Sequence, residues 1–181
     1  MRFNAISGTT MLLVMLPVFG FAKSGSSPCG DIPLLKASMS RLPAAQRFPC
    51  DSEHVVVIRD IQDFLRTHPE ISARADLRWK AEHAMAFTVG PVWPVYINLS
   101  SHRTLADAYQ RGLDWVACVF AGVLAHERVH ATGTISESAG LAAEFELDSR
   151  FRAEGRLPVE FDLQGLERQC REAKELERQA K

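Results

Sequence analysis

The residues with the clearest chemical potential lie between positions 126 and 130, where the chain reads His126-Glu127-Arg128-Val129-His130. On an α-helix, residues four apart lie one turn apart on the same face, so both imidazoles can point a ring nitrogen at one ion. Histidine nitrogen is a preferred zinc ligand, and a catalytic zinc site keeps one position open for water. The spacing therefore predicts that His126 and His130 bind Zn²⁺ and that Glu127 takes a proton from water.

A pair of helices must position these side chains. The apolar run from Trp115 to Leu124 predicts that the motif lies on a buried helix. Thr132-Gly133 is a natural helix stop, and the stretch from Thr134 to Glu137 has the form of a capping box. We therefore expect a second helix from about Ile135 to Ala153, joined to the first by a tight turn.

The second helix carries the candidates for a third ligand. Glu144 and Asp148 are four residues apart and share one face. A helix hairpin would bring Glu144 against the two histidines as the third ligand, with Asp148 placed to accept a hydrogen bond from one of them. Glu137 is the rival ligand, although capping and the helix dipole already explain an acidic residue in a first turn.

This pattern resembles a known enzyme family. His126-Glu127-x-x-His130 followed by Glu144-x-x-x-Asp148 resembles the gluzincin branch of the zincin metallopeptidases, and residues 144–150 look most like the second-helix signature of the CAAX-protease and heat-shock membrane-protease group and its soluble periplasmic relatives. The resemblance implies that His126, His130 and Glu144 bind zinc, that Glu127 is the general base, and that Asp148 orients a ligand.

The resemblance covers about thirty residues, from Val123 to Phe151. The chain departs from the family pattern at Arg128, where the family usually has an uncharged residue. It also departs in the short gap of fourteen positions between His130 and Glu144. Neither departure removes a group that the chemistry requires.

Composition bounds the rest of the chain. A length of 181 residues suits one domain with a proper core, and 46% hydrophobic with 24% charged residues is typical of a globular protein. A net charge of −1 without a basic stripe argues against a nucleic-acid partner. We expect an α+β fold that is mostly helical and zincin-like, with a small antiparallel sheet beside the active-site helix hairpin.

The sheet is expected where short β-type runs meet turn residues. Residues 84–89 and 92–99 predict two strands around Gly90-Pro91, and the edge formed by Val95 to Leu99 is expected to hold an extended peptide substrate. Residues 53–66 favour a helix, with a strand at residues 55–58 as the rival. The leucines and cysteine of residues 163–176 predict an amphipathic helix. Four residues are candidates to stabilise an oxyanion: His83, Tyr96, His102 and Tyr109.

The first 22 residues have the form of a signal peptide, with Arg2, an apolar run and small residues before a cleavage point after Ala22. We therefore expect an exported protein, periplasmic or secreted, with no stable membrane span after cleavage. Residues 23–50 are expected to form an irregular arm and residues 51–181 the metallopeptidase domain. In an oxidising compartment the four cysteines predict the pairs Cys29–Cys50 and Cys118–Cys170, with a buried free thiol as the alternative for Cys118.

These observations favour an exported zinc-dependent metallopeptidase that hydrolyses peptide bonds in a peptide or protein substrate. Two other classes remain open at this point. One is a zincin-like domain that keeps the metal and acts as a binding or regulatory module. The other is a structural exported helical protein in which the motif is coincidental.

Overall fold

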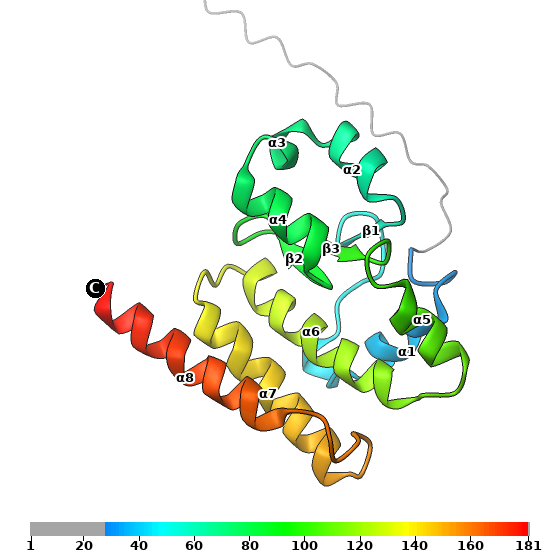
Figure 1. Cartoon of the computed structure of the whole chain (residues 1–181), viewed down its shortest axis with the longest axis vertical. Helices are drawn as coiled ribbons and strands as arrows, with labels where there is room; N and C mark the ends of the chain where they lie inside the picture. The colour runs from blue at the N-terminus through cyan, green and yellow to red at the C-terminus, as the bar shows by residue number, and fades with distance from the viewer. Residues whose placement is uncertain (1–27, 181) are drawn as a thin grey trace, which may run out of the picture.

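The computed structural model describes residues 28–180, and the signal peptide predicted at residues 1–22 lies outside this range. Helices dominate and a small sheet accompanies them, which confirms the expected mostly helical α+β class (Figure 1). In chain order the elements are α1 (Pro33–Arg41), η1 (Ala44–Gln46), β1 (Val55–Ile58), α2 (Ile61–Thr67), α3 (Pro69–Ser72), α4 (Ala75–His83), β2 (Ala86–Thr88), β3 (Val95–Asn98), α5 (Arg103–Gln110), α6 (Trp115–Ala131), α7 (Glu137–Ala153) and α8 (Leu163–Gln179).

Helix α6 is the centre of the molecule. Its first three turns, residues 115–125, are apolar on nearly every side, and a helix of that composition must be covered all round. It packs against α7, α1, α5 and strand β2. Helix α8 runs back along α7, so the chain folds into a helical half made of α6, α7 and α8 beside a second half made of the sheet and α2–α4 (Figure 1).

The sheet has three strands in the order β1-β3-β2, and it is mixed rather than antiparallel. Strand β3 pairs antiparallel with β2, as the sequence predicted, but it also pairs in parallel with β1. The prediction that residues 95–99 form an edge strand is therefore wrong, because Val55–Ile58 adopts the rival strand conformation and covers the other side of β3. The edge that faces α6 belongs to β2.

The segment expected to be an irregular arm contains α1, whose buried leucines pack against α6 as part of the main core. A disulfide joins Cys29 to Cys50, which confirms that predicted pair. It links the beginning of the segment to its end, shortly before β1. The predicted Cys118–Cys170 pair is wrong: both are free, buried thiols. Cys118 faces the main core cluster, whereas Cys170 packs between α7 and α8, where its sulfur lies 3.8 Å from the Ser138 carbonyl.

Within residues 28–180, the helices are too short or too polar for any of them to cross a membrane. Helix α8 has the predicted amphipathic pattern, with Leu166 and Cys170 buried against α7. Leu176, near its end, is 67% exposed, so the apolar stripe is covered only over its first half.

Asp148 lies inside the contact between α6 and α7. Its side chain is fully buried beside Gly122, and neither carboxylate oxygen has a hydrogen-bond partner within the described residues. Burial, together with the nearby charge of Glu144, raises the pKa of Asp148 to about 8. At neutral pH this residue is therefore a neutral acid in the core.

Replacing Asp148 with asparagine should change how stability depends on pH. A raised folded-state pKa means that the native chain holds a proton that the unfolded chain has lost, so the contribution of Asp148 declines as pH rises from about 4 to about 8. The free energy of unfolding of Asp148→Asn, minus that of the native protein, should therefore increase by about 1.4 kcal/mol per pH unit across this range. Urea unfolding of the metal-free proteins at several pH values measures the difference, and a difference that stays constant with pH would contradict the assignment.

Candidate metal centre

The two histidines of the motif lie on the last two turns of α6, and each uses one ring nitrogen to hold its orientation. The Nδ1 atom of His130 lies 2.8 Å from the Thr134 carbonyl oxygen, to which it donates. The Nδ1 atom of His126 lies 3.1 Å from the Glu144 carboxylate. With both Nδ1 atoms engaged, the two Nε2 atoms are left to face the same point.

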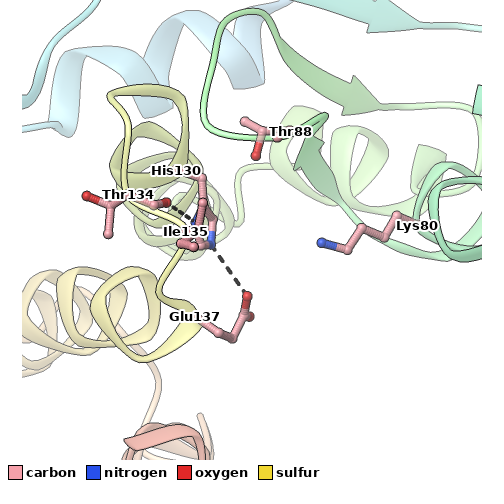
Figure 2. Close-up of a pocket in the computed structure, with 7 residues that line it drawn as sticks. Lys80, Thr88, His130, Thr134, Ile135 and Glu137 are labelled. Atoms are coloured by element: carbon pink, nitrogen blue, oxygen red, sulfur yellow. Dashed lines mark hydrogen bonds and ion pairs between the residues drawn. The ribbon is translucent and has the colours of Figure 1, made fainter. Parts of the chain in front are cut away.

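The distances between the free donor atoms suit a small metal ion. The Nε2 atoms of His126 and His130 are 3.1 Å apart, and each lies 3.5 Å from a carboxylate oxygen of Glu137. Two ligands bound about 2.05 Å from one ion at a tetrahedral angle are separated by about 3.3 Å. These three residues, whose ligand atoms all lie within 4.8 Å of one another, could therefore hold a metal. Figure 2 shows two of them, His130 and Glu137, facing each other.

Glu137 reaches the histidines because of the turn between the helices. Gly133 has a φ of 109°, a conformation that side chains with a Cβ rarely adopt, and it turns the chain sharply after α6. Helix α7 then begins at Glu137, two residues later than predicted, with the Ser136 hydroxyl accepting from the Ala139 amide as its cap. The predicted capping box does not form, so the Glu137 carboxylate faces the imidazoles.

Glu144 occupies a different place from the one expected of it. The sequence analysis put its carboxylate beside both histidines as a metal ligand, whereas the structure puts it at the outer nitrogen of His126. The reason is the close packing of α7 on α6. A Cβ at Gly140 would lie 2.8 Å from the His126 Nε2 atom, so the imidazole rests against the α7 backbone and turns its other edge towards Glu144.

Two other motif residues are turned away from the cluster. Asp148 was expected to orient a ligand histidine, but it lies one turn deeper, beside Gly122, and makes no hydrogen bond to either histidine in the described structure. Arg128 donates a 3.0 Å hydrogen bond to the Ala45 carbonyl and so ties α6 to η1. This hydrogen bond holds the Arg128 guanidinium towards η1, so a charged residue at position 128 is compatible with the candidate metal site.

The cluster is strongly coupled electrostatically. Burial on its own lowers the pKa of His126, but hydrogen bonds to the Glu137 and Glu144 carboxylates raise it overall, to about 10. The hydrogen bond to Glu137 likewise raises the pKa of His130. The two imidazoles hold the pKa of Glu137 well below its usual range. In the metal-free protein a proton on His126 therefore offsets part of the carboxylate charge, and a divalent cation would have to displace it.

Glu127 lies in the same cleft and is 9% exposed. Burial raises the pKa of its carboxyl group, while the charges of His126, His130 and Lys80 oppose that rise. The cleft has a volume of about 280 Å³ and lies between the helix hairpin and the other half of the molecule. Its lining residues are Trp79, Lys80, Ala84, Met85, Ala86, Phe87, Val123, His126, Glu127, His130, Glu137 and Glu144.

None of the four residues considered for an oxyanion role lines this cleft. His83 stacks on Trp79, and His102 contacts the His83 carbonyl oxygen. Tyr96 stacks on Phe87 within the sheet-side core, and Tyr109 of α5 packs against the main core cluster.

Lys80 and Trp79, which the sequence analysis did not select, do line the cleft. Both lie on α4, and their approach to α6 follows from the packing of α4 against β2. No sequence spacing links them to the motif, so no local signal could have identified them.

A carboxylate from α8 holds the first turn of α7. Glu177 accepts hydrogen bonds from the Ser136 and Ser138 hydroxyls, at 3.0 and 2.7 Å, and from the Ser138 amide at 3.0 Å. A negative charge at a helix N-terminus is also favoured by the helix dipole. Because Glu137 lies between the two serines, this clamp restrains the residue that faces the imidazoles.

Comparisons of the chain with protein-family models, with curated proteins and with solved structures found no match. The assignment of this centre therefore rests on its own side chains and their geometry.

Removing the Glu177 carboxylate should weaken metal binding without removing any ligand. We expect Glu177→Ala to raise the dissociation constant for Zn²⁺ or Co²⁺ by about tenfold, the lower end of the range for groups that orient ligands. Glu172→Ala, an exposed acidic residue on the same helix, is the matched control and should bind like the native protein. Competition with a chromophoric chelator measures both, and equal affinities for the two variants would show that the clamp does not position Glu137.

Proposed function

We propose that this protein is an exported zinc-dependent metallopeptidase. The observation that carries the proposal is the convergence of the His126 and His130 Nε2 atoms and the Glu137 carboxylate on one point, in a cleft that also contains Glu127. The resemblance of the HExxH motif to gluzincins agrees with it. In this proposal Glu137 is the third ligand, and Glu144 orients His126 through its outer nitrogen.

A zinc ion held by these residues would polarise a peptide carbonyl and lower the pKa of a water molecule. Glu127 then accepts the proton of the attacking water on its carboxylate and passes it to the leaving amine. Its buried setting raises its pKa above the ordinary value of a glutamate, which favours the return of the proton to the leaving amine. Glu144 and the Thr134 carbonyl keep the imidazole rings from turning.

Strand β2 is the part of the sheet best placed to hold the substrate. Ala86 and Phe87 line the cleft, and β2 is the sheet edge next to α6. An edge strand has main-chain groups available to pair with an extended peptide. The substrate-binding role that the sequence analysis gave to residues 95–99 is therefore transferred to Ala86–Thr88.

The cellular setting follows from two features. Residues 1–22 have the form of a signal peptide. The Cys29–Cys50 disulfide supports an oxidising compartment, because such bonds persist mainly in exported proteins.

The test is to compare zinc-loaded native protein with the Glu127→Gln variant on a library of quenched fluorescent peptides. The variant should keep its metal and lose about a thousandfold in kcat, because the amide cannot accept the proton of water. Removing zinc from the native protein with a chelator should abolish hydrolysis, and adding zinc back should restore it.

Two results would contradict the proposal. Equal rates for the native protein and Glu127→Gln would remove Glu127 from the chemistry. A native protein that binds one zinc per chain and cleaves no peptide would instead be a metal-dependent binding module.

A further inference from the structure

The cleft beside the candidate metal ligands contains a positively charged side chain, that of Lys80, which has no role in the proposed hydrolysis. Lys80 is the sixth residue of α4, and it lines the main cleft together with Glu127. It also lines an adjoining lobe of about 150 Å³ formed with Thr88, Gly90, Thr134 and Ile135. Lys80 thus lies where the two spaces meet. Figure 2 shows its side chain extending from α4 towards the side of the cleft that holds Glu137 and His130.

Lys80 has no fixed partner of its own. In the described part of the chain it forms no hydrogen bond or salt bridge, and its positive charge lowers the pKa of Glu127. Of the three carboxylates that line the cleft, two are engaged, since Glu137 contacts both imidazoles and Glu144 contacts His126. Lys80 is also the one lysine or arginine among the residues lining the two spaces.

An ammonium group in this position has a chemical consequence for ligand choice. The surrounding carboxylates repel an anionic ligand, so binding of such a ligand requires a cation that is free to pair with it. A lysine ammonium provides a mobile point charge that suits a single carboxylate. Lys80 itself is exposed, so this attraction is screened by salt and should weaken as ionic strength rises.

We propose that Lys80 is a specificity-determining residue that binds a substrate carboxylate close to the scissile bond. The proposal rests on the peptidase function proposed above and names its substrate class. A space of about 280 Å³ corresponds to a sphere about 8 Å across, which is the length of two to three residues of an extended peptide. The carboxylate therefore belongs to a residue within about two positions of the bond that is cut.

Two apolar side chains flank this point. Trp79 is 60% exposed at the rim of the main cleft, and Ile135 is 83% exposed at the rim of the side lobe. Exposed bulky residues at the mouth of a cleft are available to contact apolar parts of a ligand. The preferred substrate therefore combines an acidic group near the scissile bond with apolar residues on either side of it.

The carboxylate can come from two sources: the free C-terminus of a short peptide, or the side chain of an internal aspartate or glutamate. Matched peptide pairs distinguish them. One pair differs in a C-terminal acid or amide within two residues of the cleaved bond. The other differs in glutamate or glutamine at the same position, with the C-terminus blocked.

The experiment measures kcat/KM for each pair with the zinc-loaded native protein, Lys80→Gln, Lys80→Arg and Lys80→Glu. The native protein should prefer the acidic member of at least one pair by about tenfold. Lys80→Gln should abolish that preference, Lys80→Arg should retain it, and Lys80→Glu should reverse it in favour of the neutral member. Lys36→Gln, an exposed lysine on α1, is the control and should keep the native preference.

Several outcomes would overturn the inference. A native preference for the neutral member of both pairs would show that the carboxylates of the cleft dominate recognition. An equal loss of kcat for both members of a pair in Lys80→Gln would show that Lys80 stabilises the transition state and does not read the substrate.

Calorimetry of peptide binding to zinc-loaded Glu127→Gln, with and without Lys80→Gln, separates this inference from the proposed function. Selective binding of acidic peptides by Glu127→Gln, together with a native protein that hydrolyses none of them, would refute the peptidase and support Lys80 as a carboxylate-binding residue. Hydrolysis without any acidic preference would refute the role of Lys80 alone.

Discussion

Two imidazole nitrogens that face each other at 3.1 Å form the constraint on which the rest of this structure depends. Both are hydrogen-bond acceptors when the rings are neutral and their Nδ1 atoms donate elsewhere, so they repel unless a positive charge lies between them. In the metal-free protein a proton on His126 supplies that charge, because the neighbouring carboxylates raise the pKa of His126 to about 10. A metal ion bound by His126, His130 and Glu137 would supply the same positive charge. Its ligands already lie in position in the metal-free protein.

The two halves of the fold contribute different parts of the site around these two nitrogens. The helical half is rigid where the ligands lie: α6 is buried, α7 rests against the His126 ring, and Glu177 of α8 holds the turn that carries Glu137. The sheet half supplies the opposite wall of the cleft, with the β2 edge and with Trp79 and Lys80 of α4. In the proposed function, metal binding and substrate choice are therefore set by different elements. A substitution on α4 can change specificity while the ligand positions stay fixed.

Local pattern predicted the parts of the site that depend on one helix at a time. The spacing of His126 and His130 and the apolar run before them were enough to predict α6 and the shared direction of the two rings. The position of Glu137 could not be predicted in the same way. It depends on Ser136 capping α7 two residues later than expected and on a carboxylate contributed by the end of α8.

Packing between distant segments accounts for the remaining differences between the predicted and the observed structure. The parallel pairing of β1 makes β3 a central strand, and the position of Cys118 in the main core keeps it away from Cys170. Lys80 approaches the cleft only because α4 packs on β2. None of these contacts has a signature within a short stretch of sequence.

The measurement that tests the central claim most directly is the zinc content and zinc affinity of the native protein beside Glu137→Gln and Glu144→Gln. The geometry predicts about one zinc per native chain, a loss of affinity of more than about a hundredfold in Glu137→Gln, and a loss of about tenfold in Glu144→Gln, which only orients a ligand. Retention of zinc by Glu137→Gln together with its loss from Glu144→Gln would contradict the account, as would a native protein that binds no metal.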